Sequence, residues 1–450
     1  NNGVLEAVQL GANEGTSTGA LGQYTNEITL NNGGTLAVTQ TGKMSHPIVA
    51  NNGGIEVGAS ATVTMTGASV TGNGTLIKSG SGQLNFMLAN KVQTLRIDEG
   101  RVYDEGDKHK VASTVVFNGN KVELLHKNDI YSYCSDLTNF EVPEGKSGKL
   151  SMDGRCEYKG SLTGKGSLEV VSTNVRNFIT GNWSEFEGTL TASRTDGSFD
   201  FYNDKDLAKA TLSITIGCIF KNTESQNNRV KNTNMSIGAL AGNGSLGGRG
   251  TYTIGGLNTD TSFGGQFAKD INIVKEGTGT LTLSKTQADM GTLALNAGTI
   301  MLRSTSESQK ESMTGKSDMT VKGTLAGSGY CANPTVTFEA GSALCPTSTI
   351  KRNTFRSINF TGNLVMNTGS ELVFEIIDNT KYGRINVDGN MALNGTVKVT
   401  LAEDYKPVIG DEFTLWTAGN ATSVPTLTLP ELPEGLGWDT SAITSTNGVL

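Results

Sequence analysis

The sequence has few of the residues that build helical or aromatic-rich domains. Its 450 residues contain 8 prolines, 3 tryptophans and 3 histidines, and aromatic residues make up 6%. Charged residues make up 18%, against about 25% in typical globular proteins. Helix-forming runs of Ala, Leu, Glu and Lys are nearly absent, and no stretch approaches the ~20 apolar residues of a transmembrane helix. These shortages disfavour helical bundles and membrane-spanning helices.

The charge balance argues against nucleic acid as a partner. The formal net charge is −7, and Lys and Arg do not gather into a basic stripe, whereas affinity for a phosphate backbone depends on those residues. The sequence from Asn1 shows no signal peptide, which a mature or trimmed chain would also lack.

Glycine and small polar residues are abundant instead, and a short sequence motif recurs among them. The motif has a glycine, a small polar residue, a Leu or Ile, and then alternating apolar and polar residues. Among the 58 glycines, those that begin the clearest copies are Gly72 (GNGTLIKSGSG), Gly164 (GKGSLEVV), Gly242 (GNGSLGGRG), Gly277 (GTGTLTLS) and Gly323 (GTLAGSGYC).

The segment 277–303 shows the periodicity of apolar residues in the motif. Leu281 and Leu283 share one parity and Thr280 and Thr282 the other, and the alternation returns at 293–295 and 300–302. Period-two alternation predicts short strands, each with one apolar face. Corners every 7–12 residues or so, with roughly 20 residues per coil, are typical of a β-solenoid.

We therefore expect an all-β protein: a right-handed parallel β-helix (β-solenoid) with a C-terminal β-rich cap. Residues 1–345 are predicted to form coils, divergent in 1–237 and clearly repeated in 238–345, and 346–450 to form the last coils and the cap. A string of β-sandwich modules is the alternative, because it also gives short strands at this spacing. Such modules usually carry a recurring Trp or Tyr and more proline.

Three segments resemble the passenger regions of bacterial autotransporters, which contain autotransporter-associated β-strand repeats. The clearest runs from Gly248 to Arg303 and includes TSFGG, KEGTGTLTLS and AGTIMLR. A second, Gly323 to Pro346, is similar to a strand ending in G-LAPG, although Cys345 stands at the Ala position. YGRINVDGNMALNGTVKVTL and YKPVIGDEFTLWTA resemble the closing coils and the terminal cap.

The resemblance covers residues 238–418 well and the preceding part more weakly. It implies an extracellular or outer-surface β-solenoid of a Gram-negative bacterium. It does not extend to the family's translocator barrel, for which too few residues follow Trp416. It says little about activity, because one scaffold can carry adhesins, enzymes and spacers.

The five cysteines contain no CxxC pair, so neither a zinc site nor a redox motif is expected. Buried thiols acting as small apolar side chains are one interpretation. The other is a disulfide, with Cys134 and Cys156 as the better candidates, because their separation is close to one coil and should place them on neighbouring coils. Cys331 and Cys345 are closer than one coil, and Cys218 stands alone.

Motifs of metal or nucleophile chemistry are missing. His46, His109 and His126 lie in no HExxH spacing and near no GxSxG, and the polar segments around His109 and His126 predict surface positions. Acidic segments that a β-helical polysaccharide lyase or hydrolase would need occur only at 98–109, 199–206 and 401–405, which we interpret as solvated loops. No catalytic residue, metal ligand or cofactor is assigned.

Aromatic side chains on a sheet face would suit stacking against sugars. Tyr131 and Tyr133 share a parity, and with Trp183 and Tyr202 they are the candidate binding residues, whereas Phe199 and Phe201 are expected in the core. The leading hypothesis is a structural or adhesive rod, monomeric, that presents or spaces a surface module without catalysis. A surface glycan-binding protein is the alternative, and a polysaccharide lyase or hydrolase is the second alternative. Partners would be surface glycans or host-surface components.

Overall fold

A computed structural model describes most of the chain. The described residues are 3–7, 10, 21–66, 70–88, 90–105, 111–127, 134–154, 156–173, 177–195, 201–203, 206–222, 234–269, 271–285, 287–303, 312–315, 317–346, 357–423, 425–443 and 446–450. They contain strands and turns and no helix, and hence no helix that could cross a membrane. The chain divides into two compact units, Asn1–Lys231 (unit 1) and Asn232–Leu450 (unit 2).

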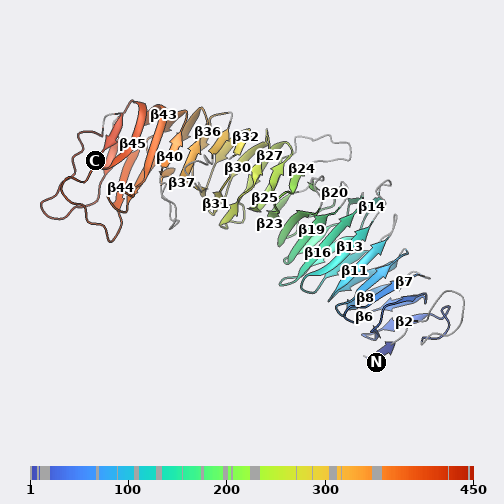
Figure 1. The fold of residues 1–450 in the computed structure, drawn as a ribbon. Coiled ribbons are helices and arrows are strands. Elements are labelled where there is room, and N and C mark those ends of the chain that lie inside the picture. The colour runs from blue at the N-terminus through green and yellow to red at the C-terminus, as the bar shows by residue number, and fades with distance from the viewer. Residues whose placement is uncertain are drawn as a thin grey trace. The chain divides into compact units, whose positions relative to one another are not determined.

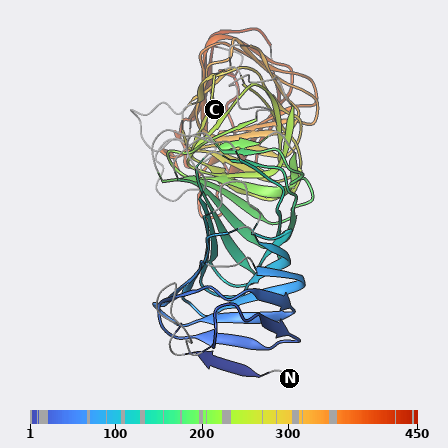
Figure 2. The same ribbon diagram turned by 90° about the vertical axis from the view of Figure 1, so that its right-hand side faces the viewer.

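Unit 1 is a parallel β-solenoid whose strands form three stacks. In Figure 1 its strands lie side by side, and Figure 2 shows its first coils as successive layers. Stack 1 contains β1 (Val4–Ala7), β3 (Thr35–Val38), β6 (Gly53–Val57), β8 (Val70–Ser79), β10 (Lys91–Ile97), β12 (Thr114–Phe117), β15 (Asn139–Val142) and β18 (Leu162–Gly164), with β2 (Ile28–Asn31) and β5 (Ile48–Asn51) beside it.

Stack 2 of unit 1 carries most of the features discussed below. It contains β4 (Gly42–Met44), β7 (Thr62–Met65), β9 (Gln83–Phe86), β11 (Arg101–Glu105), β13 (Val122–Lys127), β16 (Ser147–Asp153), β19 (Ser167–Ser172), β21 (Thr189–Arg194) and β23 (Leu207–Ile214). Stack 3 contains β14 (Cys134–Asp136), β17 (Cys156–Tyr158), β20 (Asn177–Ile179), β22 (Phe201–Asn203) and β24 (Ile219–Asn222).

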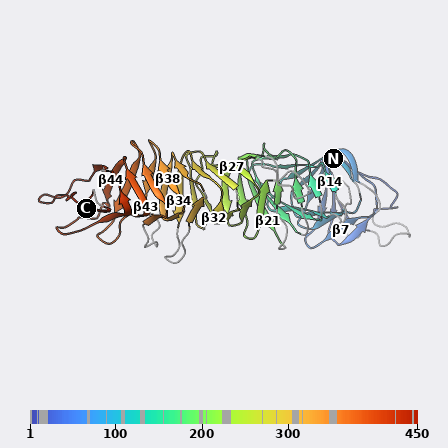
Figure 3. The ribbon, with the colours of Figure 1, turned by 90° about the horizontal axis from the view of Figure 1, so that it is seen from above.

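Unit 2 repeats this arrangement, and Figure 3 shows β34, β38, β43 and β44 among its stacked strands. One stack contains β25 (Met235–Gly242), β27 (Gly250–Ile254), β30 (Ile271–Lys275), β33 (Leu293–Leu295), β36 (Met319–Val321), β38 (Thr335–Phe338), β41 (Asn363–Met366) and β43 (Arg384–Leu393). The next contains β28 (Thr261–Phe263), β31 (Thr280–Leu283), β34 (Thr299–Arg303), β37 (Thr324–Cys331), β39 (Ala343–Cys345), β42 (Glu371–Ile376), β44 (Thr396–Leu401) and β46 (Thr426–Thr428).

The remaining strands of unit 2 form the third side and the end of the stack. They are β26 (Ser245–Gly247), β29 (Gln266–Phe267), β32 (Gln287–Met290), β35 (Ser312–Gly315), β40 (Ser357–Phe360), β45 (Thr414–Ala421) and β47 (Asn447–Val449). The strands within these stacks pair in parallel, but β47 pairs antiparallel with β45. Gly448 lies directly against the buried Trp416 ring. This antiparallel strand matches the expected β-rich cap, because it covers an edge that would otherwise stay open for pairing.

Alternation in the sequence decides which side chains enter the core. Leu281 and Leu283 are buried while Thr280 and Thr282 are half-buried, as predicted. Leu124 pairs in register with Val102 and with Leu150, so equivalent residues recur about once per coil. Each coil thereby adds one rung to a continuous apolar column.

Asparagine side chains connect successive coils at the corners. Asn258 Oδ1 accepts a hydrogen bond from the Thr278 backbone N–H at 2.8 Å, and Asn272 Oδ1 accepts one from Thr292 at 2.8 Å. A corner exposes backbone donors that no strand partner satisfies, and these amides satisfy them from the adjoining coil. Asparagine at these two corners therefore links one coil to the next.

Gly164 shows why the recurring motif needs its glycine. Its φ is +105°, and a Cβ there would collide with the Val142 carbonyl oxygen of the preceding coil. Gly145 has a similar φ of +73° but nothing within 4 Å of the Cβ position. We expect Gly164→Ala to lower the free energy of unfolding by about 2 kcal/mol and Gly145→Ala by about 1 kcal/mol, the left-handed strain alone. Chemical denaturation measures both, and equal losses would contradict the role of the close approach.

Candidate functional site

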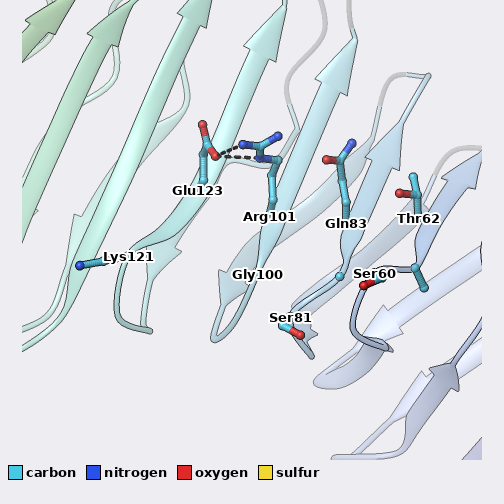
Figure 4. Close-up of a pocket in the computed structure, with 10 residues that line it drawn as sticks. Ser60, Thr62, Ser81, Gln83, Gly100, Arg101, Lys121 and Glu123 are labelled. Carbon is cyan, nitrogen blue, oxygen red and sulfur yellow. Dashed lines mark hydrogen bonds and ion pairs between the residues drawn. The ribbon is translucent and has the colours of Figure 1, made fainter.

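A polar groove of about 400 Å³ crosses four successive coils of unit 1 (Figure 4). Thr62, Gln83, Arg101 and Glu123 lie along it, and each is the register partner of the next across β7, β9, β11 and β13. Since stacked strands are about 4.8 Å apart, these side chains form a regular row. The remaining lining residues lie at the corners beside the row: Ser60, Ala61, Ser81, Gly82, Gly100 and Lys121.

The charged part of the row is an ion pair held from several sides. Arg101 Nε donates to Glu123 Oε2 at 2.7 Å, and an Nη atom lies 2.6 Å from the same oxygen. Ser151 Oγ donates to Glu123 Oε1 at 2.7 Å, and Lys149 Nζ lies 3.5 Å from it. Burial alone would raise the pKa of Glu123, but the Ser151 hydroxyl and the Arg101 charge outweigh it and hold the pKa below its ordinary value. The pair therefore stays charged and oriented at neutral pH.

The amide of Gln83 is also oriented by its neighbours. Gln83 Nε2 donates to Asn85 Oδ1 at 2.7 Å, and Asn85 Nδ2 donates to Thr64 Oγ1 at 3.2 Å. In Figure 4 the Thr62, Gln83, Arg101 and Glu123 side chains stand on the same side of their strands, one per rung. The groove thus presents hydroxyl, amide, guanidinium and carboxylate groups in fixed order.

A second cluster of functional groups lies inside unit 1. Asp104 and His126 are register partners on β11 and β13, and both point into the core. His126 Nδ1 lies 3.5 Å from Asp104 Oδ2 and 3.6 Å from Asp136 Oδ2. The edge of the buried Tyr158 ring packs against His126, with 5.8 Å between ring centroids. Two carboxylates, an imidazole and a phenol therefore share one buried space.

Burial shifts the titration of this acid–histidine cluster. Burial, and secondly the charge of Asp136, raise the pKa of Asp104 to about 7. Burial lowers the pKa of His126, against the opposing effect of Asp136. Asp104 Oδ2 has no hydrogen-bond partner, whereas Asp136 Oδ1 accepts from the Thr138 backbone N–H at 2.7 Å. The proton of the cluster is thus best placed on Asp104 near neutral pH.

The expected surface position of His126 is wrong. Its polar neighbours suggested a loop, but His126 continues the parity of Leu124 and is only 2% exposed. His46 is also buried, at 7% exposure, and His109 lies outside the described residues. The same parity on β11 carries Asp104 inward, so this part of the acidic segment 98–109 is a strand rather than a solvated loop. Segment 401–405 does turn outward, with Glu403 and Asp404 exposed.

Of the four aromatic candidates, only Trp183 has a described side chain. Trp183 is fully buried, and its indole N–H donates to the Gly160 carbonyl at 3.1 Å. The ring is a core residue without a face for a sugar, which corrects the expectation for it. Tyr131 and Tyr133 lie outside the described residues. Tyr202 lies on β22, where the backbone alone is described.

Cys134 and Cys156 occupy neighbouring coils, as predicted. They are direct register partners on β14 and β17, and the spacing of adjacent strands, about 4.8 Å, falls within the usual Cα separation of a disulfide, about 4.4–6.8 Å. The bridge itself stays a prediction. Cys331 and Cys345 are free thiols, the first buried and the second half-buried, and Cys218 is buried.

Each unit contains a buried lysine that the sequence analysis did not predict. Lys78 and Lys275 occupy inward positions and are 0% and 2% exposed. Both precede a G-x-G corner, in KSGSG and KEGTG. The signal was present, because Lys78 continues the inward parity of Leu76.

No group of three or more His, Cys, Asp or Glu with a geometry for a metal ion is found within the described ranges. Comparison with known proteins gives no family for this chain. No protein-family model matches it, and a search of curated proteins finds no match either.

Proposed function

We propose that this chain is a structural and adhesive β-solenoid of a Gram-negative cell surface, which presents or spaces a surface module and performs no catalysis. The observation that supports this most is the stacking of the described strands within each unit. Strand after strand pairs with the coils on both sides, and apolar side chains make up most of the interior.

This construction suits a spacer for a physical reason. Each coil contacts mainly its neighbours, so length can grow by adding coils without changing the core. Outward positions such as Thr280, Thr282 and Thr337 carry no packing role comparable to that of the inward residues. They are free to vary and to contact a partner. The resemblance of Gly248–Arg303 to autotransporter passengers supports an extracellular or outer-surface location.

Two measurements on the source bacterium test the proposal. Antibodies against the chain should label intact cells, and brief proteolysis of intact cells should release its peptides. The purified chain, incubated with pooled polysaccharides, should yield no new reducing ends and no unsaturated products. Label that appears only after lysis would contradict the surface role, and product formation would contradict the absence of catalysis.

A further inference from the structure

We propose that the polar groove of unit 1 binds an extended, hydroxyl-rich polysaccharide chain, which lies along the stack and crosses the rungs from Thr62 to Glu123. This goes beyond a presenting role and does not depend on it, because the argument uses only the groove itself.

The first step is the match of spacing. Thr62, Gln83, Arg101 and Glu123 are consecutive register partners, so polar groups recur every ~4.8 Å along the stack. The sugar rings of an extended linear polysaccharide recur at nearly the same interval. A chain parallel to the stack can therefore offer one ring to each rung, whereas a compact ligand would use only part of the row.

The second step is the chemistry of the lining. The only aliphatic side chain that lines the groove is Ala61, whereas pockets for drug-like ligands are mostly apolar. Arg101 donates hydrogen bonds, Glu123 accepts them, and the Gln83 amide and the hydroxyls of Ser60 and Ser81 can do both. Sugar hydroxyls also donate and accept, so a polyhydroxylated ligand can satisfy this mixed row.

The third step is preorganisation. Ser151 and Lys149 hold Glu123, which in turn holds Arg101, and Asn85 orients Gln83. Ordering flexible side chains costs affinity, and here the protein has ordered them before a ligand arrives. An open, shallow groove of this kind fits a long ligand that gains affinity from several rungs.

The experiment begins with an array of linear polysaccharides, both neutral and uronic-acid-containing, to find a bound chain. Titration calorimetry with its di-, tetra- and hexasaccharides should show affinity rising up to about four residues, one for each rung. Gln83→Ala and Arg101→Gln should each weaken binding about tenfold, the effect of losing a hydrogen bond to a charged or oriented group.

Arg96→Gln is the matched control. Arg96 on β10 also forms a surface ion pair, in which an Nη atom lies 2.8 Å from Asp98 Oδ2. Its side chain is 38% exposed, and that of Arg101 is 46% exposed. Arg96 does not line the groove. This variant should bind like the wild type. The proposal is overturned if the array shows no bound chain, if affinity does not depend on chain length, or if Arg96→Gln and Arg101→Gln weaken binding equally.

Discussion

Replacing Lys78 by Met should lower the free energy of unfolding of unit 1 by about 3 kcal/mol, since it removes the buried ammonium that donates to three backbone carbonyls. Lys78 Nζ donates to the carbonyl oxygens of Ser79 at 2.8 Å, Gly80 at 2.5 Å and Glu99 at 3.0 Å. Two of these carbonyls belong to its own corner and one to the next coil. A single ammonium therefore ties successive corners together from inside.

The charge on this lysine survives its burial. Burial lowers the pKa of Lys78 to about 8, while Glu99 and Glu56 oppose that effect. The ammonium form thus still predominates at pH 7, and only this form has a proton for each of the three carbonyls. Methionine fills a similar volume, so the loss should come from the polar contacts rather than from a cavity.

Lys275 provides an independent test in unit 2. Its Nζ donates to the carbonyls of Glu276 at 2.7 Å, Gly277 at 3.1 Å and Ala297 at 3.4 Å. Lys275→Met should destabilise unit 2 by about 2 kcal/mol, less than Lys78→Met because two of these bonds are longer.

Guanidinium denaturation combined with amide hydrogen exchange measures both losses and locates them. Protection should fall first in β8 and β10 for Lys78→Met, and in β30 and β33 for Lys275→Met. Lys91→Met and Lys322→Met change exposed lysines in the same units and should cost less than about 0.5 kcal/mol. Similar losses in the buried and exposed variants would show that the corner contacts contribute nothing.

Replacing Asp104 by Asn should stabilise unit 1 by roughly 2–3 kcal/mol at pH 8, although the substitution lies in the core. Above its pKa Asp104 is a buried anion close to the charge of Asp136, and its Oδ2 accepts no hydrogen bond. An amide of the same shape removes the charge and can donate to its neighbours. The gain should therefore exceed the cost of the lost carboxylate contact with His126.

The sign of the pH dependence follows from the raised pKa. The ordinary pKa is 3.8 and that of Asp104 in the folded chain is about 7. Between these values the folded chain keeps a proton that the unfolded chain has lost, so the wild type loses stability as pH rises from about 4 to 7. Below pH 4 both forms are protonated. The advantage of Asp104→Asn should accordingly vanish at low pH and reach a plateau above pH 7.

The measurement is chemical denaturation of both proteins at intervals from pH 4 to 8. His126, whose lowered pKa acts in the opposite direction, is present in both and largely cancels in the difference. Asp98→Asn, in the surface pair with Arg96, should change stability by less than about 1 kcal/mol without this pH profile. Parallel curves for the wild type and Asp104→Asn would refute the assignment of the proton to Asp104.

The two sites differ in how far parity could have revealed them. Val102 and Leu124 mark the inward parity of β11 and β13, so Asp104 and His126 were predictable as inward residues from the sequence. Their meeting with Asp136 and Tyr158 was not predictable, because β14 and β17 belong to another stack. The polar groove could not be predicted from parity either, since its row of side chains depends on the register between residues 18–22 positions apart.

The sequence by itself determined the architecture of this protein. Period-two alternation and glycine corners are local properties of the sequence. A motif that recurs once per coil can bury its apolar face only if successive coils stack. Only the tertiary structure decided where functional groups converge. Coils differ in length by a few residues, so the neighbour of Gln83 on the next rung is Arg101 rather than another residue nearby. Register across coils, which no local pattern encodes, aligned the polar side chains into one row and brought the members of the acid–histidine cluster together.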